Sequence, residues 1–399
     1  MKDILIIAHF IMTASEKGNG RFTELADIIC KKNKNCNVEL LTTSFSHGTK
    51  EQRNIALDAK TNSGYKITMI NEPGYKKNIS LTRFHSHYIF SRNVEKYLNK
   101  RNKPDIIYCA VPSLDVAYIA AKYAKKNDIK FIIDIQDLWP EAFKMVFNVP
   151  ILSSLMFKPM ELKANYIYKN ADEIIAVSET YMNRGIKVNQ KVKEGISVFL
   201  GTNLEYFDEC TKNNKINKPK DEIWLSYVGT LSYSYDLNLV IDALKIVKEK
   251  GINNIKFIVM GDGPLKSKFE LYAKSSGINV DFKGKLEYSQ MAKYLNKSDI
   301  CVNPIVKGSA GSIINKVGDY AAAGIPVVNT QDSLEYRNLV ERYKCGLNCK
   351  TGDVKDLSEK IIYLYNNNSI RLEMGRNNRK LAEEKFDRKI NYSKIIEII

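Results

Sequence analysis

Short apolar runs alternate along this chain with longer segments whose apolar residues recur every three or four positions. Residues 4–8 form a continuous apolar run, which is typical of a parallel strand covered on both faces. Residues 21–29 have helical spacing, and residues 38–43 supply the next strand. A strand, a helix and a second strand form a βαβ unit, which requires a parallel sheet. The chain is therefore predicted to belong to the α/β class.

The same alternation continues and then restarts in the second half. Residues 210–220 replace apolar residues with Lys, Asn and Pro, which is typical of a linker, and a new strand follows at residues 223–228. A chain of 399 residues is also too long for one ordinary core. We expect two Rossmann-like, doubly wound parallel-sheet domains facing across a cleft, over residues 1–205 and 206–380, with a C-terminal helix at 381–399 that returns to the first domain.

The amino-acid composition indicates what kind of protein this is. An apolar fraction of 44% and a charged fraction of 27% are typical of a folded soluble protein. Residues 4–13 resemble a signal segment only superficially, because Asp3 precedes them and no small-residue cleavage pattern follows. The seven cysteines are scattered and odd in number, and Cys345 and Cys349 lack a second ligand pair. We expect a cytoplasmic chain without disulfides or a structural metal.

The net charge of +16 has two interpretations, a solvated Lys/Asn-rich surface or attraction to a polyanion or an anionic membrane face. Residues 82–103 predict an amphipathic helix with a basic face. Within it, His85 and His87 have the wrong spacing for a metal pair. Surface positions are expected for both, and the alternative is that one of them is an acid/base group or a phosphate contact. Residues 143–169 mix apolar residues with lysines, which fits either a helix in a membrane interface or a pair of core helices.

Polar residues and glycines follow several predicted strands, at the edge where open α/β sheets bind ligands. Residues 18–21, which include Gly20 and Arg21, lack the Gly-x-Gly-x-x-Gly fingerprint but still allow a ligand to approach the backbone. Asp137 and Glu141 flank Trp139 just after another strand. This arrangement suits a general base or a sugar-stacking platform, and Trp139 as core filler is the alternative.

The stretch 303–328 carries the strongest local signal. It contains the end of a strand, a Gly/Ser-rich loop, a helix bearing Lys316 and Asp319, and Gly-x-Pro before an apolar strand. A glycine-rich loop frees backbone N–H groups at a helix N-terminus, where an anion is favoured. A nucleotide diphosphate would suit this position.

These motifs together resemble the family-4 retaining glycosyltransferases of GT-B fold. The resemblance is carried by Gly229-Thr230-Leu231, Met260-Gly261-Asp262-Gly263-Pro264, Phe282-x-Gly284 and Lys316-x-x-Asp319-Tyr320-x-Ala322-Ala323-Gly324-x-Pro326. Residues 137–141 are similar to the bacterial branch that builds O-antigen and capsular polysaccharide, including N-acetyl-fucosamine transferases.

The resemblance implies an activity. A UDP-sugar would donate an N-acetylated hexose or deoxyhexose to a polyprenyl-diphosphate-linked saccharide, with the anomeric configuration kept and without a metal or separate cofactor. The chain would work in peripheral contact with the cytoplasmic face of an anionic inner membrane.

The resemblance also implies site residues. Lys316 would stabilise the leaving UDP, and Asp319 stands where the family has the second glutamate of a Glu-x7-Glu motif, assigned to the donor ribose. The first glutamate of that motif falls at Gly311, and the family's cation after Gly229 is replaced by Thr230 or by Tyr235 and its neighbours. The expected catalytic residues are Lys316, Asp137, Glu141 and Gln136, which aligns with a family histidine. The expected donor contacts are Gly20, Arg21, Gly229, Thr230, Gly261, Gly263, Gly284, Lys285, Leu286, Gly311, Ser312, Ile313, Lys316 and Asp319.

Three other functions fit the sequence less well. A GT-B transferase could act on another lipid or a small molecule. A UDP-sugar epimerase needs carboxylates on both sides of the sugar, and the one strong acidic cluster is Asp134, Asp137 and Glu141. A nucleic-acid-binding protein would need a recognition motif that this sequence does not contain.

Overall fold

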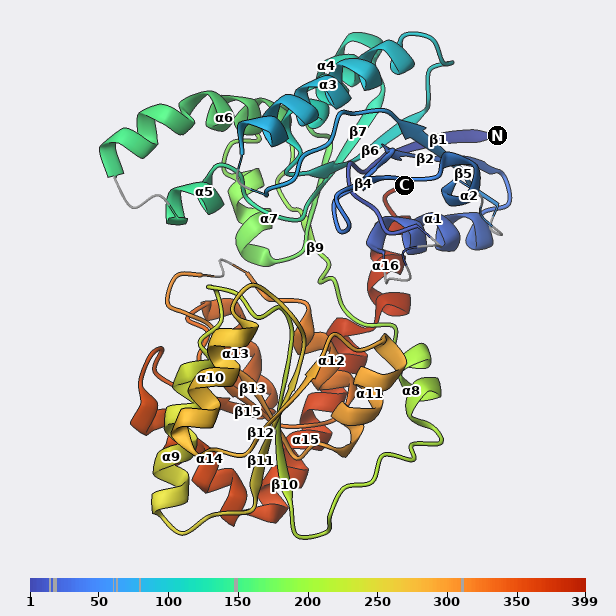
Figure 1. The fold of residues 1–399 in the computed structure, drawn as a ribbon. Coiled ribbons are helices and arrows are strands. Elements are labelled where there is room, and N and C mark those ends of the chain that lie inside the picture. Colours follow the sequence, from blue (N-terminus) through green and yellow to red (C-terminus); the bar gives the residue numbers. More distant parts are fainter. Residues whose placement is uncertain are drawn as a thin grey trace. The chain divides into compact units, whose positions relative to one another are not determined.

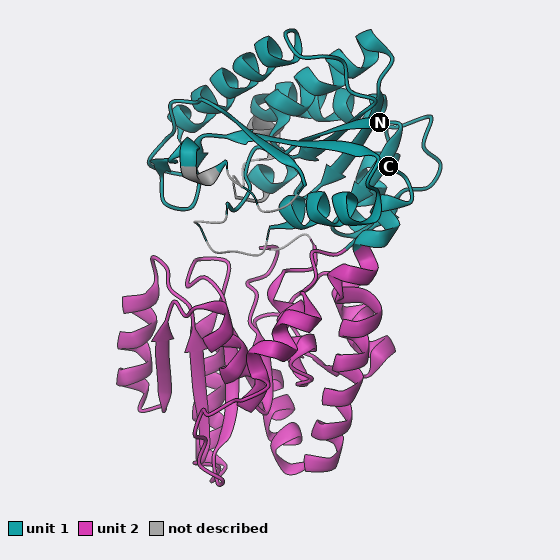
Figure 2. Ribbon diagram, turned by 90° about the vertical axis from the view of Figure 1, so that its right-hand side faces the viewer, with its two compact units in different colours: residues 1–198, 392–399 teal, residues 199–391 magenta. Residues whose placement is uncertain are grey.

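The computed structural model describes residues 1–13, 16, 20–59, 61, 64–78, 80–146, 150–309 and 312–399. The chain forms two compact units, unit 1 with residues 1–198 and 392–399, and unit 2 with residues 199–391 (Figures 1 and 2). The chain thus changes unit before the segment that the composition suggested as a linker. The reason is that Phe199, Cys210 and Ile216 pack against the apolar core of unit 2.

Unit 1 is built on a seven-stranded sheet in the order β5-β2-β1-β6-β7-β8-β9, with every neighbouring pair parallel. The sheet grows from β1 toward β5 and then restarts with β6 on the other side of β1. The point between β1 and β6 is therefore the topological switch point, where such sheets bind ligands. The strands are β1 (Lys2–Ile7), β2 (Cys36–Thr43), β5 (Lys66–Ile70), β6 (Ile106–Val111), β7 (Lys130–Ile135), β8 (Glu173–Ala176) and β9 (Ile196–Ser197).

Helices cover both faces of this sheet, and a small antiparallel hairpin, β3 (Phe45–Ser46) and β4 (Glu51–Gln52), follows β2 (Figure 1). The core gathers Ile4, Ile6 and Leu40 from the strands with Tyr392 and Ile395 from the end of the chain. The helices are α1 (Arg21–Lys32), α2 (Ile55–Asp58), α3 (Leu81–Leu98), α4 (Leu114–Asn127), α5 (Glu141–Val146), α6 (Pro150–Asn170), α7 (Glu179–Ile186) and the last part of α16 (Arg388–Ile396).

Unit 2 repeats the plan with a six-stranded parallel sheet in the order β12-β11-β10-β13-β14-β15. Its strands are β10 (Ile223–Val228), β11 (Ile255–Met260), β12 (Val280–Gly284), β13 (Ile300–Asn303), β14 (Val327–Asn329) and β15 (Gly346–Asn348). Its helices are α8 (Leu204–Thr211), α9 (Leu237–Glu249), α10 (Lys266–Ser276), α11 (Tyr288–Lys297), α12 (Lys316–Ala322), α13 (Leu334–Tyr343), α14 (Val354–Asn366) and α15 (Asn368–Leu381), and a π-helical turn at Ala382–Phe386 leads into α16.

The predicted class, two doubly wound parallel-sheet units, is confirmed. Continuous apolar runs such as residues 4–8 become strands because both faces of a parallel sheet are covered by helices. Among the helices that the structure describes, none is long and apolar enough to cross a membrane.

Candidate functional site

Three glycine loops meet at the carboxyl edge of the unit 2 sheet. Gly229 follows β10, Gly261 follows β11 and Gly284 ends β12. The Gly229 N–H donates to the Met260 carbonyl over 3.0 Å, and the Gly261 N–H donates to the Gly284 carbonyl over 2.8 Å. Gly261 has a φ of +157°, and a Cβ there would lie 1.8 Å from the Gly229 carbonyl oxygen. The loops therefore pack backbone against backbone, and only glycine fits at Gly261.

Lys316, the first residue of α12, is buried beside these loops. Its Nζ lies 3.6 Å from the centre of the Tyr235 ring and 4.0 Å from that of Tyr227. A Cβ at Gly229 would lie 2.7 Å from this Nζ. Within the described residues the Nζ has no hydrogen-bond partner, and burial lowers the pKa of Lys316 well below its usual value. An amino group without a partner, held between two tyrosine rings at a ligand edge, is suited to an anion, because a bound anion favours its protonated form.

The loop after β10 carries no basic residue of its own. The amino group that lies beside Gly229 belongs to Lys316 of α12. Tyr227 donates its hydroxyl proton to the Thr230 carbonyl over 2.9 Å, while the Thr230 side chain is exposed. The cation is thus supplied by an element remote in sequence.

Asp319 is partly buried and already has two partners. One carboxylate oxygen accepts hydrogen bonds from Thr202 Oγ1 over 2.9 Å and from the Tyr288 hydroxyl over 3.0 Å. Burial raises the pKa of this carboxyl group. These contacts give Asp319 a structural role, and its expected contact with a donor ribose stays a prediction.

The other residues of unit 2 that were expected to contact the donor differ in their exposure to solvent. Lys285 is exposed, whereas Ile313 and Leu286 pack in the core. Ser312 is held by its carbonyl, which accepts from Gln331 Nε2 over 2.7 Å. A Cβ at Gly263 would meet the Leu231 carbonyl oxygen at 2.4 Å. Gly311 lies outside the described residues.

In unit 1, two expected site residues share one buried carboxylate. Arg21 donates from Nε to Asp134 over 2.7 Å and from Nη1 to the Val198 carbonyl over 2.9 Å. Gln136 donates from Nε2 to the same Asp134 over 2.6 Å. Arg21 and Gln136 are therefore brought together as a structural cluster, and their roles toward a substrate stay predictions. Gly20 is the residue before α1, and Arg21 is the first residue of that helix.

Asp137 and Glu141 have partners other than Asp134. Asp137 accepts from the Tyr181 hydroxyl over 3.2 Å, and burial raises its pKa. One oxygen of Glu141 pairs with Arg184, and the other is buried without a hydrogen-bond partner among the described residues. Trp139 is 8% exposed, so its interpretation as a core residue fits the structure.

One polar network was not expected from the sequence. His9, two residues after β1, places Nε2 2.9 Å from Glu72 and Nδ1 2.9 Å from Ser113 Oγ. Its ring stacks between Phe10 and Phe90 at 4.1 Å from each. Ser113 follows β6, so the network lies at the switch point of the sheet. The only local signal was a histidine directly after the first strand.

The expectation of surface positions for both histidines of α3 is correct for His85 and wrong for His87. His85 is exposed, whereas His87 is 4% exposed and stacks against Trp139. The helical period explains the difference, because positions 87, 90 and 94 share the face that packs on the sheet.

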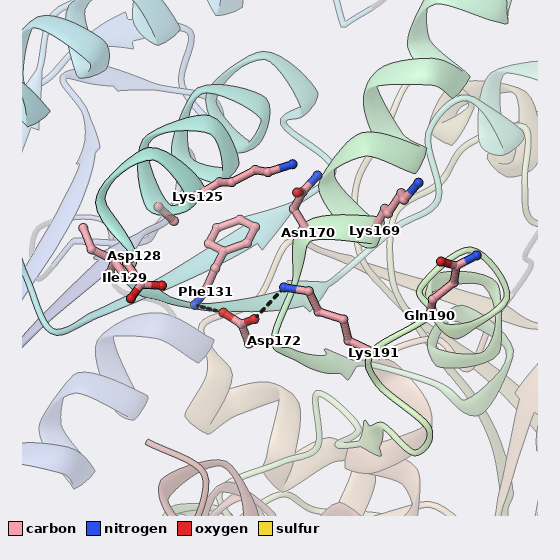
Figure 3. Close-up of a pocket in the computed structure, with 10 residues that line it drawn as sticks. Lys125, Asp128, Ile129, Phe131, Lys169, Asn170, Asp172, Gln190 and Lys191 are labelled. Atoms are coloured by element: carbon pink, nitrogen blue, oxygen red, sulfur yellow. Dashed lines mark hydrogen bonds and ion pairs between the residues drawn. The ribbon is translucent and has the colours of Figure 1, made fainter.

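A cavity of about 270 Å³ in unit 1 is a separate feature (Figure 3). It is lined by the start of β7 and by α4, α6 and Lys191, which pairs with Asp172. It therefore lies at the amino edge of the sheet, opposite the edge where ligands bind in such folds.

The fold and the glycine edge of unit 2 define the GT-B class, and comparisons with solved structures agree. Sucrose-phosphate synthase from Thermosynechococcus elongatus aligns with a TM-score of 0.74 at 16% identity, over 100% of this chain and 98% of that one. HepE from Anabaena, solved in complex with UDP, aligns with a TM-score of 0.70 at 15% identity, over 100% of this chain and 99% of that one. At these identities the likeness establishes the fold alone.

Sequence comparisons find a matching family model and several related glycosyltransferases. Residues 208–381, which lie in unit 2, match the family model described as "Glycosyl transferases group 1". A capsular polysaccharide biosynthesis glycosyltransferase from Staphylococcus aureus is 26% identical over 237 residues, 56% of this chain and 60% of that protein.

An uncharacterized glycosyltransferase from Methanocaldococcus jannaschii is 24% identical over 241 residues, 59% of this chain and 61% of that protein. The chain thus spans about three fifths of the length of these curated relatives. A third relative is the Campylobacter jejuni "GalNAc-alpha-(1->4)-GalNAc-alpha-(1->3)-diNAcBac-PP-undecaprenol alpha-1,4-N-acetyl-D-galactosaminyltransferase", 24% identical over 260 residues, 61% of this chain and 69% of that protein.

Proposed function

We propose that the chain is a retaining glycosyltransferase that binds a UDP-sugar on unit 2. The observation that carries this proposal is the buried, unpaired ammonium group of Lys316 beside Gly229. A nucleotide diphosphate supplies the negative charge that this group lacks. Two structures of the Anabaena HepE protein, in complex with UDP and with UDP-glucose, support a donor of this kind.

Lys316 has a direct chemical task in this proposal. When the bond from the sugar to the diphosphate breaks, negative charge develops on the leaving UDP. A fixed ammonium group stabilises that charge in the transition state, and the low-dielectric surroundings strengthen the interaction. The Tyr227 and Tyr235 rings hold the group in place before the donor arrives. Lys316 thus supplies positive charge where other transferases use a divalent metal, and we propose metal-independent transfer.

The acceptor that we propose is a polyprenyl-diphosphate-linked saccharide in surface polysaccharide synthesis, with an N-acetylated hexose or deoxyhexose transferred. The names of two relatives support this choice. One refers to capsular polysaccharide biosynthesis, and the other to a diphosphate-undecaprenol acceptor and an N-acetylated sugar.

A membrane-bound acceptor requires contact with a membrane. Helix α6 exposes Leu155, Met156 and Leu162, with exposed fractions of 76%, 53% and 59%, and carries Lys158 among them. Its Ala164 and Ile167 are buried, so the core interpretation holds for the other side of the same helix. Apolar side chains and basic charge together favour peripheral binding to an anionic cytoplasmic membrane face.

An assay of the purified protein against a panel of UDP-sugars tests the proposal. A lipid-diphosphate saccharide serves as acceptor, mass spectrometry detects the product, and NMR reports its anomeric configuration. We expect one UDP-sugar to yield a retained product together with free UDP, in the presence of EDTA. Interconversion of UDP-sugars without release of UDP would indicate an epimerase, and transfer only to a soluble small molecule would indicate the other acceptor class.

A further inference from the structure

Unit 1 holds a group of basic side chains that the proposed donor site does not use. His47 and Lys50 are the first and last residues of the turn of the β3–β4 hairpin, and Arg83 lies in the first turn of α3. They gather around Tyr75 and Asn78 in the loop after β5. We name this group the Tyr75 cluster.

Asn78 brings the two strongest cations of the Tyr75 cluster together. Lys50 Nζ donates to Asn78 Oδ1 over 2.6 Å, and Arg83 Nη1 donates to the Asn78 carbonyl over 2.8 Å. Both cations also face the Tyr75 ring, Lys50 at 4.8 Å and Arg83 at 5.6 Å from its centre. The Tyr75 hydroxyl in turn is hydrogen-bonded to His47 Nδ1. Two basic groups thus converge on neutral partners.

The cations of the Tyr75 cluster have no directly paired carboxylate among the described residues. Within the part of the chain that the structure describes, no carboxylate lies within 4.0 Å of the charged nitrogens of Lys50 or Arg83. The acids that attract Arg83 from further away have other partners. Asp137 accepts from Tyr181, and Glu72 binds His9 with one oxygen and Ser86 with the other. Burial, and then the neighbouring Lys50 and Arg83, lower the pKa of His47 to about 4. Like charges held together in this way are stabilised by a bound anion.

The place of the Tyr75 cluster in the fold is also that of a ligand site. The hairpin follows β2 and the Asn78 loop follows β5, so both lie at the carboxyl edge of the parallel sheet. Lys50 has a φ of +64°, a left-handed conformation that is unfavourable for a lysine. Strained backbone of this kind is concentrated at functional sites. Lys50, Arg83 and His47 are each half-buried, so a ligand can reach them from solvent.

We propose that the Tyr75 cluster binds a phosphate or diphosphate group of the acceptor. Its role toward an acceptor rests on the proposed transferase function. The Arg83 guanidinium suits two phosphate oxygens at once, and Lys50 adds a point charge on the other side of Tyr75. A lipid-linked diphosphate and a soluble phosphate share this chemistry, and the experiment separates them.

Pyrophosphate is the first probe. Its binding to the whole protein is measured by calorimetry with saturating UDP present, so that the donor site is filled. We expect Arg83→Gln and Lys50→Gln each to weaken pyrophosphate binding about tenfold, the loss of one charged hydrogen-bonding partner. Arg92→Gln, on the exposed face of the same helix, is the matched control and should change the affinity less than twofold.

Arg83 also holds Asn78, so the melting temperature of each variant is measured, and Arg83→Lys provides a charge-retaining variant. It should bind more tightly than Arg83→Gln. UDP affinity should stay within about twofold in all variants. If UDP binding falls together with pyrophosphate binding, the Tyr75 cluster belongs to the donor and our assignment is wrong.

Vesicles of phosphatidylcholine with and without phosphatidic acid, whose headgroup is a phosphomonoester, form the second arm. Binding to the phosphatidic acid vesicles that depends on Arg83 would indicate a lipid-linked phosphate as the ligand. If only pyrophosphate binding depends on Arg83, the ligand is a soluble phosphate. If the protein binds neither pyrophosphate nor phosphatidic acid vesicles at millimolar concentrations of phosphate groups, the inference is overturned. If UDP still binds normally in that case, the proposed donor site on unit 2 is unaffected. If pyrophosphate binds but UDP does not, the donor proposal is refuted and the anion site at the Tyr75 cluster remains.

Discussion

At the scale of single residues, Lys316 and Asp319 lie on one helix but have very different surroundings. They lie three positions apart on α12, and the sequence pattern assigned both to the donor. In the structure Lys316 Nζ lies beside Gly229 without a hydrogen-bonding partner in the described residues, whereas Asp319 binds Thr202 and Tyr288. The pattern locates the helix, but the neighbours of each side chain decide its chemistry.

Replacement of the buried ammonium group should separate stability from activity. We expect Lys316→Met to raise the free energy of unfolding of the ligand-free protein by about 1 kcal/mol or more, because no buried charge has to be accommodated. The same variant should lose turnover and detectable UDP binding. Denaturant unfolding and calorimetry measure the two effects. Lys268→Met removes an exposed lysine of unit 2 and should change neither. Turnover near the wild-type level in Lys316→Met would remove this residue from the site.

The stability gain of Lys316→Met should also depend on pH. Burial lowers the pKa of Lys316 in the folded state, so between the folded and unfolded pKa values the unfolded chain binds one more proton. Stability of the wild type therefore rises with pH between the folded and unfolded pKa values, and the cost of Lys316 disappears above the unfolded one. We expect the difference between variant and wild type to be larger at about pH 6 than at about pH 10. A constant difference would show that the ammonium is not destabilised by burial.

At the scale of elements, the carboxyl edge of the unit 2 sheet depends on the glycines that follow its strands. Gly229, after β10, donates to Met260 of β11, and Gly261, after β11, donates to Gly284 of β12, so the loops pack backbone against backbone. Gly-x-Gly-Pro after an apolar run predicted such a loop. The close approach of Gly261 to Gly229 depends on two strands meeting, so it follows only from the sheet order.

A methyl group at Gly261 should disturb this edge. We expect Gly261→Ala to lower the free energy of unfolding by about 2 kcal/mol or more and to weaken UDP binding, because its Cβ would overlap the Gly229 carbonyl. Gly277→Ala is the matched control. Gly277 has a φ of +63° but open space around it, so it should lose only about 1 kcal/mol and keep UDP binding. Equal losses in the two variants would mean that backbone strain, not the clash, is decisive.

Helix α6 provides a second test at this scale. Leu155→Ser combined with Leu162→Ser should reduce binding to anionic vesicles about tenfold, because two exposed apolar side chains no longer enter the interface. Co-sedimentation measures this, and Leu271→Ser, an exposed leucine of unit 2, is the control. Binding should also weaken at high salt if the net charge of +16 contributes. An unchanged vesicle affinity in the double variant would exclude α6 as the contact.

At the scale of the whole molecule, the two ends of the chain belong to the same unit. Residues 392–399 complete unit 1 after the chain has formed all of unit 2. Tyr392 and Ile395 are fully buried in the core that Ile4 and Ile6 also form. Unit 1 therefore depends on residues from both ends of the sequence.

Loss of this last segment's packing should weaken unit 1. We expect Ile395→Ala to lower the free energy of unfolding of unit 1 by about 2–4 kcal/mol, because it leaves a cavity in the core. The two tryptophans, Trp139 and Trp224, lie in different units, so in a Trp224→Phe background fluorescence reports unit 1 alone. Ile390→Ala, half exposed on the same helix, should cost less than about 1 kcal/mol. Equal effects of the two variants would contradict the role of the segment.

The sequence by itself determined the alternation of strands and helices and the glycine loops after β10 and β11. It also located Lys316 at the start of a helix. These features follow from apolar periodicity and glycine spacing, which are local properties. Only the tertiary structure decided which side chains meet. His9 with Glu72 and Ser113, Lys50 with Arg83, and Lys316 with Tyr227 all come from separate segments. Their contacts depend on strand order, register and helix packing, which local spacing does not specify.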